Sequence, residues 1–331
     1  MVLVDAVYLN SPGGVVLLQL FIKSLLKDQK SRTVLLLDYR LKNKLIELED
    51  FKYVFFCKNN EFSRFYFYLK IRDLFDKVLC FSNVPPPIFT LNKSVKTFVF
   101  FHNILILEPL IHFFNLFKII SFKSLYIKFL NNSKYAWIVQ NEEIKNLLKN
   151  QIPLNRIIVA PFFYEFETTT SNPENAYFYP SSGLPHKNHR LLFQAWELLH
   201  KVNNNKIPLY VTLNSEEFSA FSKGLNSFQI INLGNISHKD VLERLRSVKY
   251  LIFPSLKESF GLPLIESTFC GNCILCSKSE VSSALVKDAY FFDPLSISDI
   301  IDKVLLSQKK HMYSKLLIKN QIETLKSELY D

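Results

Sequence analysis

The stretch SLKESFGLPLIES, residues 255–267, places two carboxylates, Glu258 and Glu266, on either side of a turn. The apolar run YLIFPS leads into it and is typical of a buried strand. Pro263 suits the first turn of a helix, where its missing N–H is not needed, and Gly271 suits the helix exit. We therefore expect Glu258 in a loop and Glu266 about one turn inside the helix.

A strand, turn and helix arranged in this way can bind a ligand through the backbone. Amides at a helix N-terminus lack intrahelical partners, and Gly261 has no Cβ to hold a ligand away. The amides concerned are those of Ser259, Phe260, Gly261 and Leu262. The stretch thus predicts a cradle for an anion or for sugar hydroxyls. Carboxylates accept hydrogen bonds from paired hydroxyls, so Glu266 suits a ribose and Glu258 a second ring.

Short apolar runs alternate with longer helical patterns along the chain, which predicts parallel sheets wound with helices. The expected strands are 2–9, 33–38, 78–82, 97–101, 135–140, 157–160, 176–179, 208–213, 229–233, 250–254, 273–276 and 289–292. Helices are expected near 188–202, 238–247 and 261–270, and the last thirty or so residues are expected to be helical. The polar segment 164–175 lacks apolar periodicity and is the predicted linker.

Length and composition favour two folded domains. A chain of 331 residues with 48% hydrophobic content exceeds one ordinary core, and this composition excludes disordered and fibrous proteins. The net charge of +10 suggests an anionic partner: a phosphorylated small molecule, a nucleic acid or an acidic membrane face. Lys, Phe, Asn and Ile are abundant in this chain. A nucleotide bias of the genome would account for that abundance, and it explains the positive charge equally well.

Five cysteines, an odd number, argue against a disulfide framework and for a reducing compartment. The opening residues MVLVDAVYLNSPGG lack the features of a secretory signal, so we expect a cytoplasmic protein. The run CGNCILC, with Cys270, Cys273 and Cys276, invites a zinc interpretation. A structural zinc site needs about four ligands, and these three span a helix end and a strand, so we expect small buried side chains instead.

The most apolar region, 104–130, is interrupted by charged and polar residues, and no transmembrane segment is expected. Within it, 110–130 combines aromatic residues with Lys118, Lys123 and Lys128. A surface helix of that composition could lie on an anionic membrane. Core packing of the aromatic residues is equally consistent with the pattern.

Several passages carry a family resemblance. FPSLKESFGLPLIES resembles the E-x7-E signature of retaining GT-B glycosyltransferases of family 4, the group 1 type, here as Glu258 and Glu266. AYFYPSSGLPHKNHRLLFQAWELL resembles the opening strand, Lys-bearing loop and helix of the second domain, and INLGNISHKDVLERLRSVKYLIFPS resembles the segment before the signature. In the first half, NSPGG matches the glycine loop, while FSNVPPPIF and KTFVFFHN resemble bacterial members that assemble surface polysaccharide.

The resemblance implies an α/β GT-B fold: two facing, doubly wound Rossmann-like domains with a deep interdomain cleft and C-terminal helices. Residues 1–165 would form the acceptor-side domain and 166–310 the nucleotide-sugar-binding domain. Residues 311–331 would form a helix that packs back across the domains.

The resemblance also implies roles for single residues. Lys187 would neutralise the donor diphosphate and Glu266 would hold the ribose. Glu258, with amides of the turn, would orient the transferred sugar and a phosphate oxygen. In the first domain, Gly13 and Gly14 would let backbone amides approach the phosphates, and His102 would hydrogen-bond the donor sugar. The ordinary alternatives are a surface lysine at 187, a structural histidine at 102 and a simple turn at the two glycines.

One position departs from the family pattern. The family has an Arg about six residues before the Lys, and this sequence has Ser181 there. His186 or another basic residue would then share the phosphate charge.

The expected function is transfer of a sugar from a nucleotide-sugar to a glycan or polyprenyl-linked saccharide, with retention, in bacterial lipopolysaccharide O-antigen or capsule biosynthesis. No metal, no further cofactor and no nucleic-acid partner is expected, and the protein would work in the cytoplasm or peripherally on the inner membrane. The alternatives are a nucleotide-sugar epimerase of the same fold and a basic nucleic-acid-binding protein.

Overall fold

The computed structural model describes the whole chain except residues 46, 88–93, 107–116, 168–171, 204–205 and 226–228. The chain divides into two compact units. Unit 1 consists of Met1–Phe163 and Lys319–Asp331, and unit 2 of Tyr164–Ile318. The first division falls at the start of the predicted linker 164–175. The second falls inside the predicted C-terminal segment 311–331, of which only the final part belongs to unit 1.

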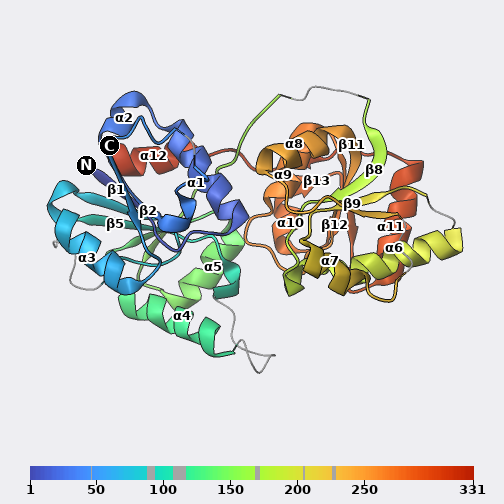
Figure 1. Cartoon of the computed structure of the whole chain (residues 1–331), viewed down its shortest axis with the longest axis horizontal. Helices are drawn as coiled ribbons and strands as arrows, with labels where there is room; N and C mark the ends of the chain where they lie inside the picture. The colour runs from blue at the N-terminus through green and yellow to red at the C-terminus, as the bar shows by residue number, and fades with distance from the viewer. Residues whose placement is uncertain (46, 88–93, 107–116, 168–171, 204–205, 226–228) are drawn as a thin grey trace. The chain divides into compact units, whose positions relative to one another are not determined.

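Unit 1 contains a sheet with helices packed around it (Figure 1). The sheet has seven parallel strands in the order β3-β2-β1-β4-β5-β6-β7. The strands are β1 (Val2–Ala6), β2 (Thr33–Asp38), β3 (Tyr53–Cys57), β4 (Lys77–Cys80), β5 (Lys96–Phe100), β6 (Ala136–Val139) and β7 (Arg156–Val159). All are predicted except β3, a half-buried edge strand that pairs with β2 from Val34↔Tyr53 onward. Central strands are buried on both faces, as helices on both sides of a parallel sheet require.

The helices α1 to α5 of unit 1 lie between its parallel strands along the chain, and α12 is the C-terminal helix. Their bounds are α1 (Pro12–Ser24), α2 (Lys27–Ser31), α3 (Glu61–Ile71), α4 (Phe117–Leu130), α5 (Glu142–Gln151) and α12 (Ile322–Tyr330), with short 3₁₀ turns η1 (Tyr39–Leu41), η2 (Arg72–Leu74) and η3 (Ile104–Ile106). α5 begins because the Asn141 side chain accepts a hydrogen bond from the Ile144 N–H, which caps the helix.

Unit 2 repeats this design with a six-stranded parallel sheet of order β10-β9-β8-β11-β12-β14. Its strands are β8 (Glu174–Tyr179), β9 (Leu209–Val211), β10 (Ile230–Asn232), β11 (Val248–Phe253), β12 (Cys273–Ser277) and β14 (Tyr290–Phe292). Its helices are η4 (Pro185–Lys187), α6 (His189–Asn203), α7 (Ser215–Ser222), α8 (His238–Ser247), α9 (Leu262–Cys270), α10 (Glu280–Leu285) and α11 (Ile297–Lys309).

The last part of the chain is not continuously helical, so that prediction is wrong. α11 ends at Lys309, and the chain then forms β15 (Lys315–Leu316), which pairs antiparallel with β13 (Val286–Lys287). The Leu317 N–H also donates to the Leu285 carbonyl, at 2.8 Å. These pairings with distant backbone override the local helical pattern, and a helix resumes only at α12.

The helix α12 packs on unit 1. The hydroxyls of Tyr330 and Thr33 are hydrogen-bonded at 2.6 Å, and the ammonium of the buried Lys326 donates to the Ser24 carbonyl at 3.0 Å. Lys77 donates to the Glu328 carbonyl. The C-terminal segment thus returns to the sheet on which the chain began.

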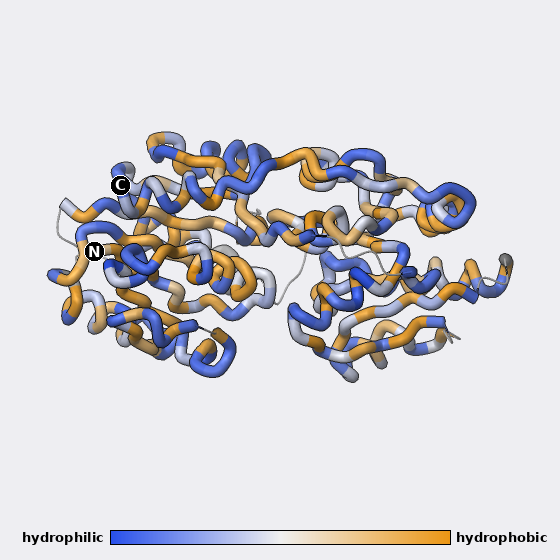
Figure 2. The backbone as a smooth tube through the Cα atoms, turned by 90° about the horizontal axis from the view of Figure 1, so that it is seen from above, coloured by the Kyte–Doolittle hydropathy of each residue, from blue (hydrophilic) through white to orange (hydrophobic). Residues whose placement is uncertain are grey.

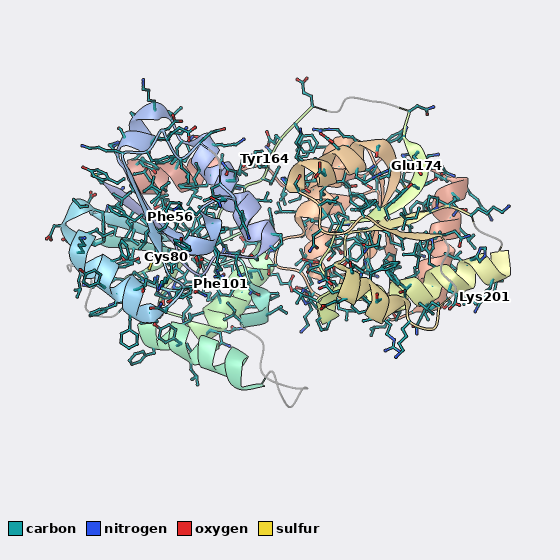
Figure 3. All side chains as sticks on the ribbon, viewed as in Figure 1. Phe56, Cys80, Phe101, Tyr164, Glu174 and Lys201 are labelled. Carbon is teal, nitrogen blue, oxygen red and sulfur yellow. The ribbon has the colours of Figure 1, made fainter. Side chains whose placement is uncertain are left out.

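Hydrophobic and hydrophilic stretches alternate along the backbone of both units (Figure 2). Side chains fill the space between each sheet and its helices: Phe101 and Cys80 lie inside unit 1, whereas Lys201 at the end of α6 points outward (Figure 3). In unit 2 the rings of Tyr177 and Tyr250 stack across adjacent strands with centroids 4.4 Å apart. Each unit therefore has its own core.

Candidate donor site and a cavity in unit 1

The strand order of unit 2 places its predicted site residues together. The winding direction of the sheet reverses between the neighbouring strands β8 and β11. Ligands of doubly wound sheets bind in the crevice at such a reversal, outside the carboxyl ends of the strands. The loop after β8 carries Lys187, and the loop after β11 carries Glu258.

Lys187 and Glu258 form an ion pair. The Nζ atom lies 2.6 Å from Oε1, and the two side chains are only 17% and 14% exposed. The hydroxyl of the buried Tyr179 donates to the Lys187 carbonyl at 2.9 Å and lies 2.9 Å from Ser255 Oγ. Both charges therefore have little access to water. If a charged ligand group took the place of either partner, it would interact strongly with the charge that remains.

The two loops are also tied through Asn188, which has a left-handed backbone with φ of 59°. Its amide donates to the carbonyls of Pro254, at 3.3 Å, and Pro294, at 2.7 Å. The Leu256 N–H donates to the His186 carbonyl at 2.8 Å. Carboxyl-end loops of three strands are thereby joined around the ion pair.

The turn before α9 confirms the predicted helix boundaries. α9 spans Leu262–Cys270, Pro263 lies in its first turn, and Gly271 at its C-cap has φ of 73°. Gly261 is the N-cap, with φ of 80°, and a Cβ there would lie 3.2 Å from Leu285 Cδ1. Glycine is thus required by the backbone conformation itself, a reason that the sequence interpretation did not identify. Phe260 is buried, and Gly261 at the N-cap makes no side-chain hydrogen bond to α9.

Glu266 is buried inside α9 and has a partner that the sequence interpretation missed. His238 Nε2 lies 2.6 Å from Glu266 Oε1. An imidazole N–H can donate to a carboxylate oxygen, so the contact fits a hydrogen bond from His238 to Glu266. His238 is the first residue of α8, which Ser237 and Asp240 cap reciprocally. The S-x-x-D pattern predicts that helix start but not which carboxylate His238 meets.

His189 does not supply a positive charge near Ser181. The Ser181 N–H donates to Thr212 Oγ1 at 3.0 Å. Burial lowers the pKa of His189 to about 4, and its Nε2 lies 2.9 Å from the Ser182 carbonyl, so the ring is neutral near pH 7. His186 is half-buried in the same loop.

The unit 1 candidates lie together at the carboxyl ends of its strands. A Cβ on the buried Gly14 would lie 2.7 Å from Leu9 Cδ1 and Ser11 Oγ and 3.2 Å from His102 Nε2. Close approach to these groups is why glycine stands there, whereas Gly13 is exposed.

His102 follows β5 and is held on two sides. Its N–H donates to Asn83 Oδ1 at 2.7 Å, and its ring stacks on Phe100 with centroids 5.5 Å apart. Burial lowers the pKa of His102 to about 4, so it can hydrogen-bond a ligand only as a neutral imidazole near pH 7.

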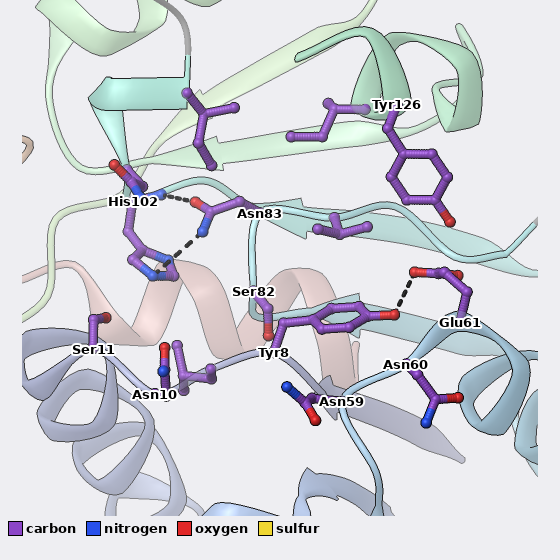
Figure 4. A pocket seen from close by; sticks show the side chains of 15 residues that line it. Tyr8, Asn10, Ser11, Asn59, Asn60, Glu61, Ser82, Asn83, His102 and Tyr126 are labelled. Carbon is purple, nitrogen blue, oxygen red and sulfur yellow. Dashed lines mark hydrogen bonds between the residues drawn. The ribbon is translucent and has the colours of Figure 1, made fainter. Parts of the chain in front are cut away.

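A cavity of about 370 Å³ opens beside His102 (Figure 4). Its lining comes from the loops after β1, β3, β4 and β5 and from η3 and α4. It includes Tyr8, Glu61 and Tyr126, none of which the sequence interpretation selected. These residues lie far apart in the sequence, and no short motif joins them.

The three clustered cysteines do not form a metal site. Cys273 and Cys276 lie three residues apart on β12, so they face opposite sides of the sheet, and both are fully buried. Burial raises the pKa of Cys276 to about 12, which disfavours the thiolate. The prediction of small buried side chains is confirmed for these two residues. Among the described residues, no group of three or more His, Cys, Asp or Glu is placed to hold a metal ion.

The segment 110–130 is described in part. Residues 110–116 lie outside the described residues, and the segment is helical from Phe117 to Leu130. Leu125 and Phe129 are 63% and 71% exposed, whereas Ile127 and Leu130 are buried. In the part of the chain that the structure describes, no helix is both long enough and apolar enough to span a membrane.

Comparison with known proteins agrees with this geometry. Residues 162–321, which carry the Lys187–Glu258 pair and Glu266, match the family of glycosyl transferases group 1. The chain contains a glycosyl transferases group 1 domain. That domain includes the whole of unit 2.

Two curated Escherichia coli proteins are similar to part of the chain. The serotype-specific mannosyltransferase WbdA is 29% identical over 124 residues, covering 35% of this chain and 15% of WbdA. The O-antigen chain mannosyltransferase B is 28% identical over 129 residues, covering 37% of this chain and 34% of that protein. The similarity thus spans about a third or less of these relatives' own length.

A solved structure shares the fold of the whole chain. The Anabaena protein HepE, determined in complex with UDP and glucose, has a TM-score of 0.68 over 100% of this chain and 95% of its own, at 14% identity. The group 1 glycosyltransferase domain and the two parallel sheets confirm the predicted α/β GT-B fold.

Proposed function

We propose that the chain transfers a sugar from a nucleotide-sugar donor to a hydroxyl of a glycan or lipid-linked glycan, with retention of the anomeric configuration, in the assembly of bacterial O-antigen or capsule. The observation that carries the proposal is the paired Lys187 and Glu258 at the reversal point of the unit 2 sheet, inside the matched domain. The names of the E. coli relatives make mannose the first sugar to test.

The proposed roles follow from what each group can do. The ammonium of Lys187 neutralises a donor diphosphate, which replaces Glu258 as its partner. Glu258 is then free to accept hydrogen bonds from hydroxyls of the transferred sugar. Glu266, oriented by His238, accepts from the ribose hydroxyls. Roles for Gly13, Gly14, His102 and His186 in donor binding stay predictions.

The reaction needs charge stabilisation at the leaving group. The bond between the anomeric carbon and the diphosphate oxygen breaks, and the acceptor oxygen forms its bond to that carbon on the same face. The acceptor proton passes to the departing diphosphate. Lys187 stabilises the negative charge that develops there, which is the main contribution that this chain's residues make.

The test begins with the donor. Thermal unfolding of the full chain with UDP-, GDP- and dTDP-sugars should show a raised Tm for one nucleotide class, because a ligand that binds only the folded state stabilises it. The selected donor is then incubated with and without glycan acceptors. We expect free nucleoside diphosphate only when acceptor is present. Interconversion of the donor sugar without acceptor would instead indicate an epimerase, and absence of binding by every donor would contradict the proposal.

We further propose that the acceptor is reached at an anionic membrane surface. Along α3, apolar side chains recur with i, i+3, i+4, i+7 spacing and are exposed: Phe62 (90%), Phe65 (41%), Tyr66 (64%) and Leu69 (40%). The neighbouring α4, whose Tyr126 lies close to Glu61 at the start of α3 (Figure 4), exposes Leu125 and Phe129 beside Lys128. An apolar face with adjacent lysines fits anionic lipid.

Co-sedimentation of the full chain with vesicles tests the membrane proposal. At low salt we expect binding to vesicles that contain phosphatidylglycerol, and little binding to phosphatidylcholine alone. The double variant Phe62→Ser/Phe129→Ser should lose binding. The control Tyr313→Ser removes an aromatic ring in unit 2 that is 71% exposed and should bind as wild type does. Failure of the wild-type chain to sediment with anionic vesicles would refute the proposal.

A further inference from the structure

The cavity in unit 1 lies at the reversal point of that unit's sheet. The order β3-β2-β1-β4-β5-β6-β7 reverses between β1 and β4. The loop after β1 supplies the residues from Tyr8 to Ser11, and the loop after β4 supplies those from Ser82 to Val84. Doubly wound sheets bind ligands at this position, and a volume of about 370 Å³ falls within the range of small-molecule sites.

The polar lining of the cavity is dominated by neutral groups. Carboxamides and hydroxyls each donate and accept hydrogen bonds, as sugar hydroxyls do. The neutral polar residues are Tyr8, Asn10, Ser11, Asn59, Asn60, Ser82, Asn83, Asn103 and Tyr126. Ser82 is only 7% exposed, its Oγ is buried without a hydrogen-bond partner in the described structure, and it lies beside the Tyr8 ring (Figure 4). A buried hydroxyl without a protein partner needs a hydrogen bond from a ligand hydroxyl or a water molecule.

The single formal charge among the described lining residues is negative. Glu61 supplies it, and the lining includes no Lys or Arg. His102 is neutral near pH 7 because its pKa is about 4. Outside the lining, Arg64 Nη1 lies 3.8 Å from Glu61 Oε1, but that guanidinium is 1% exposed and already paired with Asp5 at 2.8 Å. Although the chain as a whole carries a charge of +10, the described lining of this cavity therefore supplies no cation for an anionic ligand.

Two phenols lie at the Glu61 carboxylate. The hydroxyl of Tyr8 donates to it, and the hydroxyl of Tyr126 lies close by (Figure 4). Burial, and then the interaction with Glu61, raise the pKa of both phenols, so both stay protonated. A carboxylate has about four acceptor positions, so the bond from Tyr8 leaves capacity for ligand hydroxyls.

A buried guanidinium fixes the surrounding backbone. Arg64, 1% exposed, donates through Nε to Asp5 at 2.9 Å and through Nη1 and Nη2 to the carbonyls of Pro85 and Val84 at 2.9 and 3.1 Å. Tyr8 is held with φ of 78°. The cavity is therefore preformed, which reduces the entropy lost when a ligand binds.

We propose that this cavity binds an uncharged sugar ring of the acceptor, and that Glu61 selects neutral rings over phosphorylated or acidic ones. The assignment of that ring to the acceptor rests on the proposed transfer reaction, whereas the preference for a neutral ring follows from the lining itself. The Glu61 carboxylate accepts hydrogen bonds from ring hydroxyls and repels a carboxylate or phosphate at the same place.

Ligand-observed NMR on the full chain, without nucleotide, tests this directly. The probes are methyl α-D-mannopyranoside, methyl β-D-glucopyranoside and N-acetylglucosamine, against mannose 6-phosphate and glucuronic acid. We expect saturation transfer to one or more neutral probes and none to the acidic ones. Glu61→Gln should raise the Kd of the neutral probe about ten-fold, as loss of a hydrogen bond to a charged group does, and should narrow the discrimination against glucuronic acid.

Two further variants keep the result interpretable. Glu49→Gln makes the same change at an exposed position of unit 1 and should bind as wild type does. Tyr8→Phe removes only the hydroxyl that donates to Glu61 and should raise the Kd about five-fold, through lost orientation of Glu61. Should Glu61→Gln unfold, as thermal unfolding would show, Tyr8→Phe decides the question.

Three results would overturn the inference: no neutral probe binds the wild-type chain, acidic sugars bind as tightly as neutral ones, or nucleotide-sugars alone compete for the cavity. Each can occur while nucleotide binding and acceptor-dependent transfer are intact, in which case the proposed function stands. Conversely, glycoside binding without any nucleotide binding would reject the proposed function and keep the cavity as a sugar site.

Discussion

His238 Nε2 lies 2.6 Å from Oε1 of Glu266, and this contact joins the first turn of α8 to the interior of α9. The Glu266 side chain is 5% exposed and that of His238 is 28% exposed. The contact engages Oε1 of the Glu266 carboxylate. We infer that His238 is a positioning residue for the carboxylate expected to bind the ribose.

Replacement of His238 should weaken nucleotide binding without removing it. In His238→Ala the carboxylate keeps its charge but loses the donor that orients it, so the Kd of the cognate nucleoside diphosphate should rise about five- to ten-fold. Titration calorimetry measures the change. Lys239→Ala, at an 84% exposed side chain on the same helix, is the matched control and should bind normally. Equal affinities for His238→Ala and wild type would show that the contact does not orient the site.

The Lys187–Glu258 pair should contribute to folding as well as to binding. In Lys187→Met, Glu258 is left poorly solvated without its partner, and the free energy of unfolding should fall by about 1–3 kcal/mol. The double variant Lys187→Met/Glu258→Gln should be more stable than the sum of the single changes predicts, as measured by urea denaturation. The Lys145–Glu142 pair, whose side chains are 33% and 66% exposed, is the control, where Lys145→Met should change stability by about 0.5 kcal/mol or less. Simple additivity at the first pair would contradict the coupling.

Adjacent glycines should respond in opposite directions to the same change. Gly14→Ala places a Cβ 2.7 Å from Leu9 Cδ1 and Ser11 Oγ, and we expect a loss of about 1–3 kcal/mol in the free energy of unfolding. Gly13→Ala, at an exposed position in the first turn of α1, should be neutral or stabilising by about 0.5–1 kcal/mol, since alanine favours helix. Thermal unfolding of both variants measures these changes. A Gly14→Ala protein as stable as wild type would contradict the close packing around His102.

His102 should make stability depend on pH below neutrality. Its folded pKa of about 4 lies below the ordinary value of 6.5, so the unfolded chain binds a proton over this range when the folded chain does not. The contribution is fully present above about pH 6.5 and is lost as the pH falls from about 6.5 to about 4. His102→Asn should flatten the stability curve in that window, while His189, whose pKa is also about 4, keeps its own contribution. NMR titration giving His102 an ordinary pKa would reject this account.

The sequence predicted features whose cause is local and missed those made by distant partners. Pro263 and Gly271 encode the start and end of α9 through their own conformational limits, and both boundaries were predicted. The partner of Glu266 lies 28 positions away and that of Glu258 lies 71 positions away, so only the fold brings them together.

The unit 1 cavity was not predicted from the sequence for the same reason. Tyr8, Glu61 and Tyr126 lie on three separate segments, and their spacing along the sequence forms no motif. The helical pattern near the C-terminus failed for the same reason, because the pairing of β15 with β13 is decided by a strand far back in the chain. Local propensity yields to such tertiary contacts.

The most direct measurement is a crystal structure of the full chain with its cognate nucleoside diphosphate. The account predicts ribose hydroxyls hydrogen-bonded to Glu266, His238 still in contact with that carboxylate, and the diphosphate within reach of the Lys187 ammonium. A nucleotide bound elsewhere, with Lys187 and Glu258 still paired and Glu266 out of contact with it, would contradict the central claim.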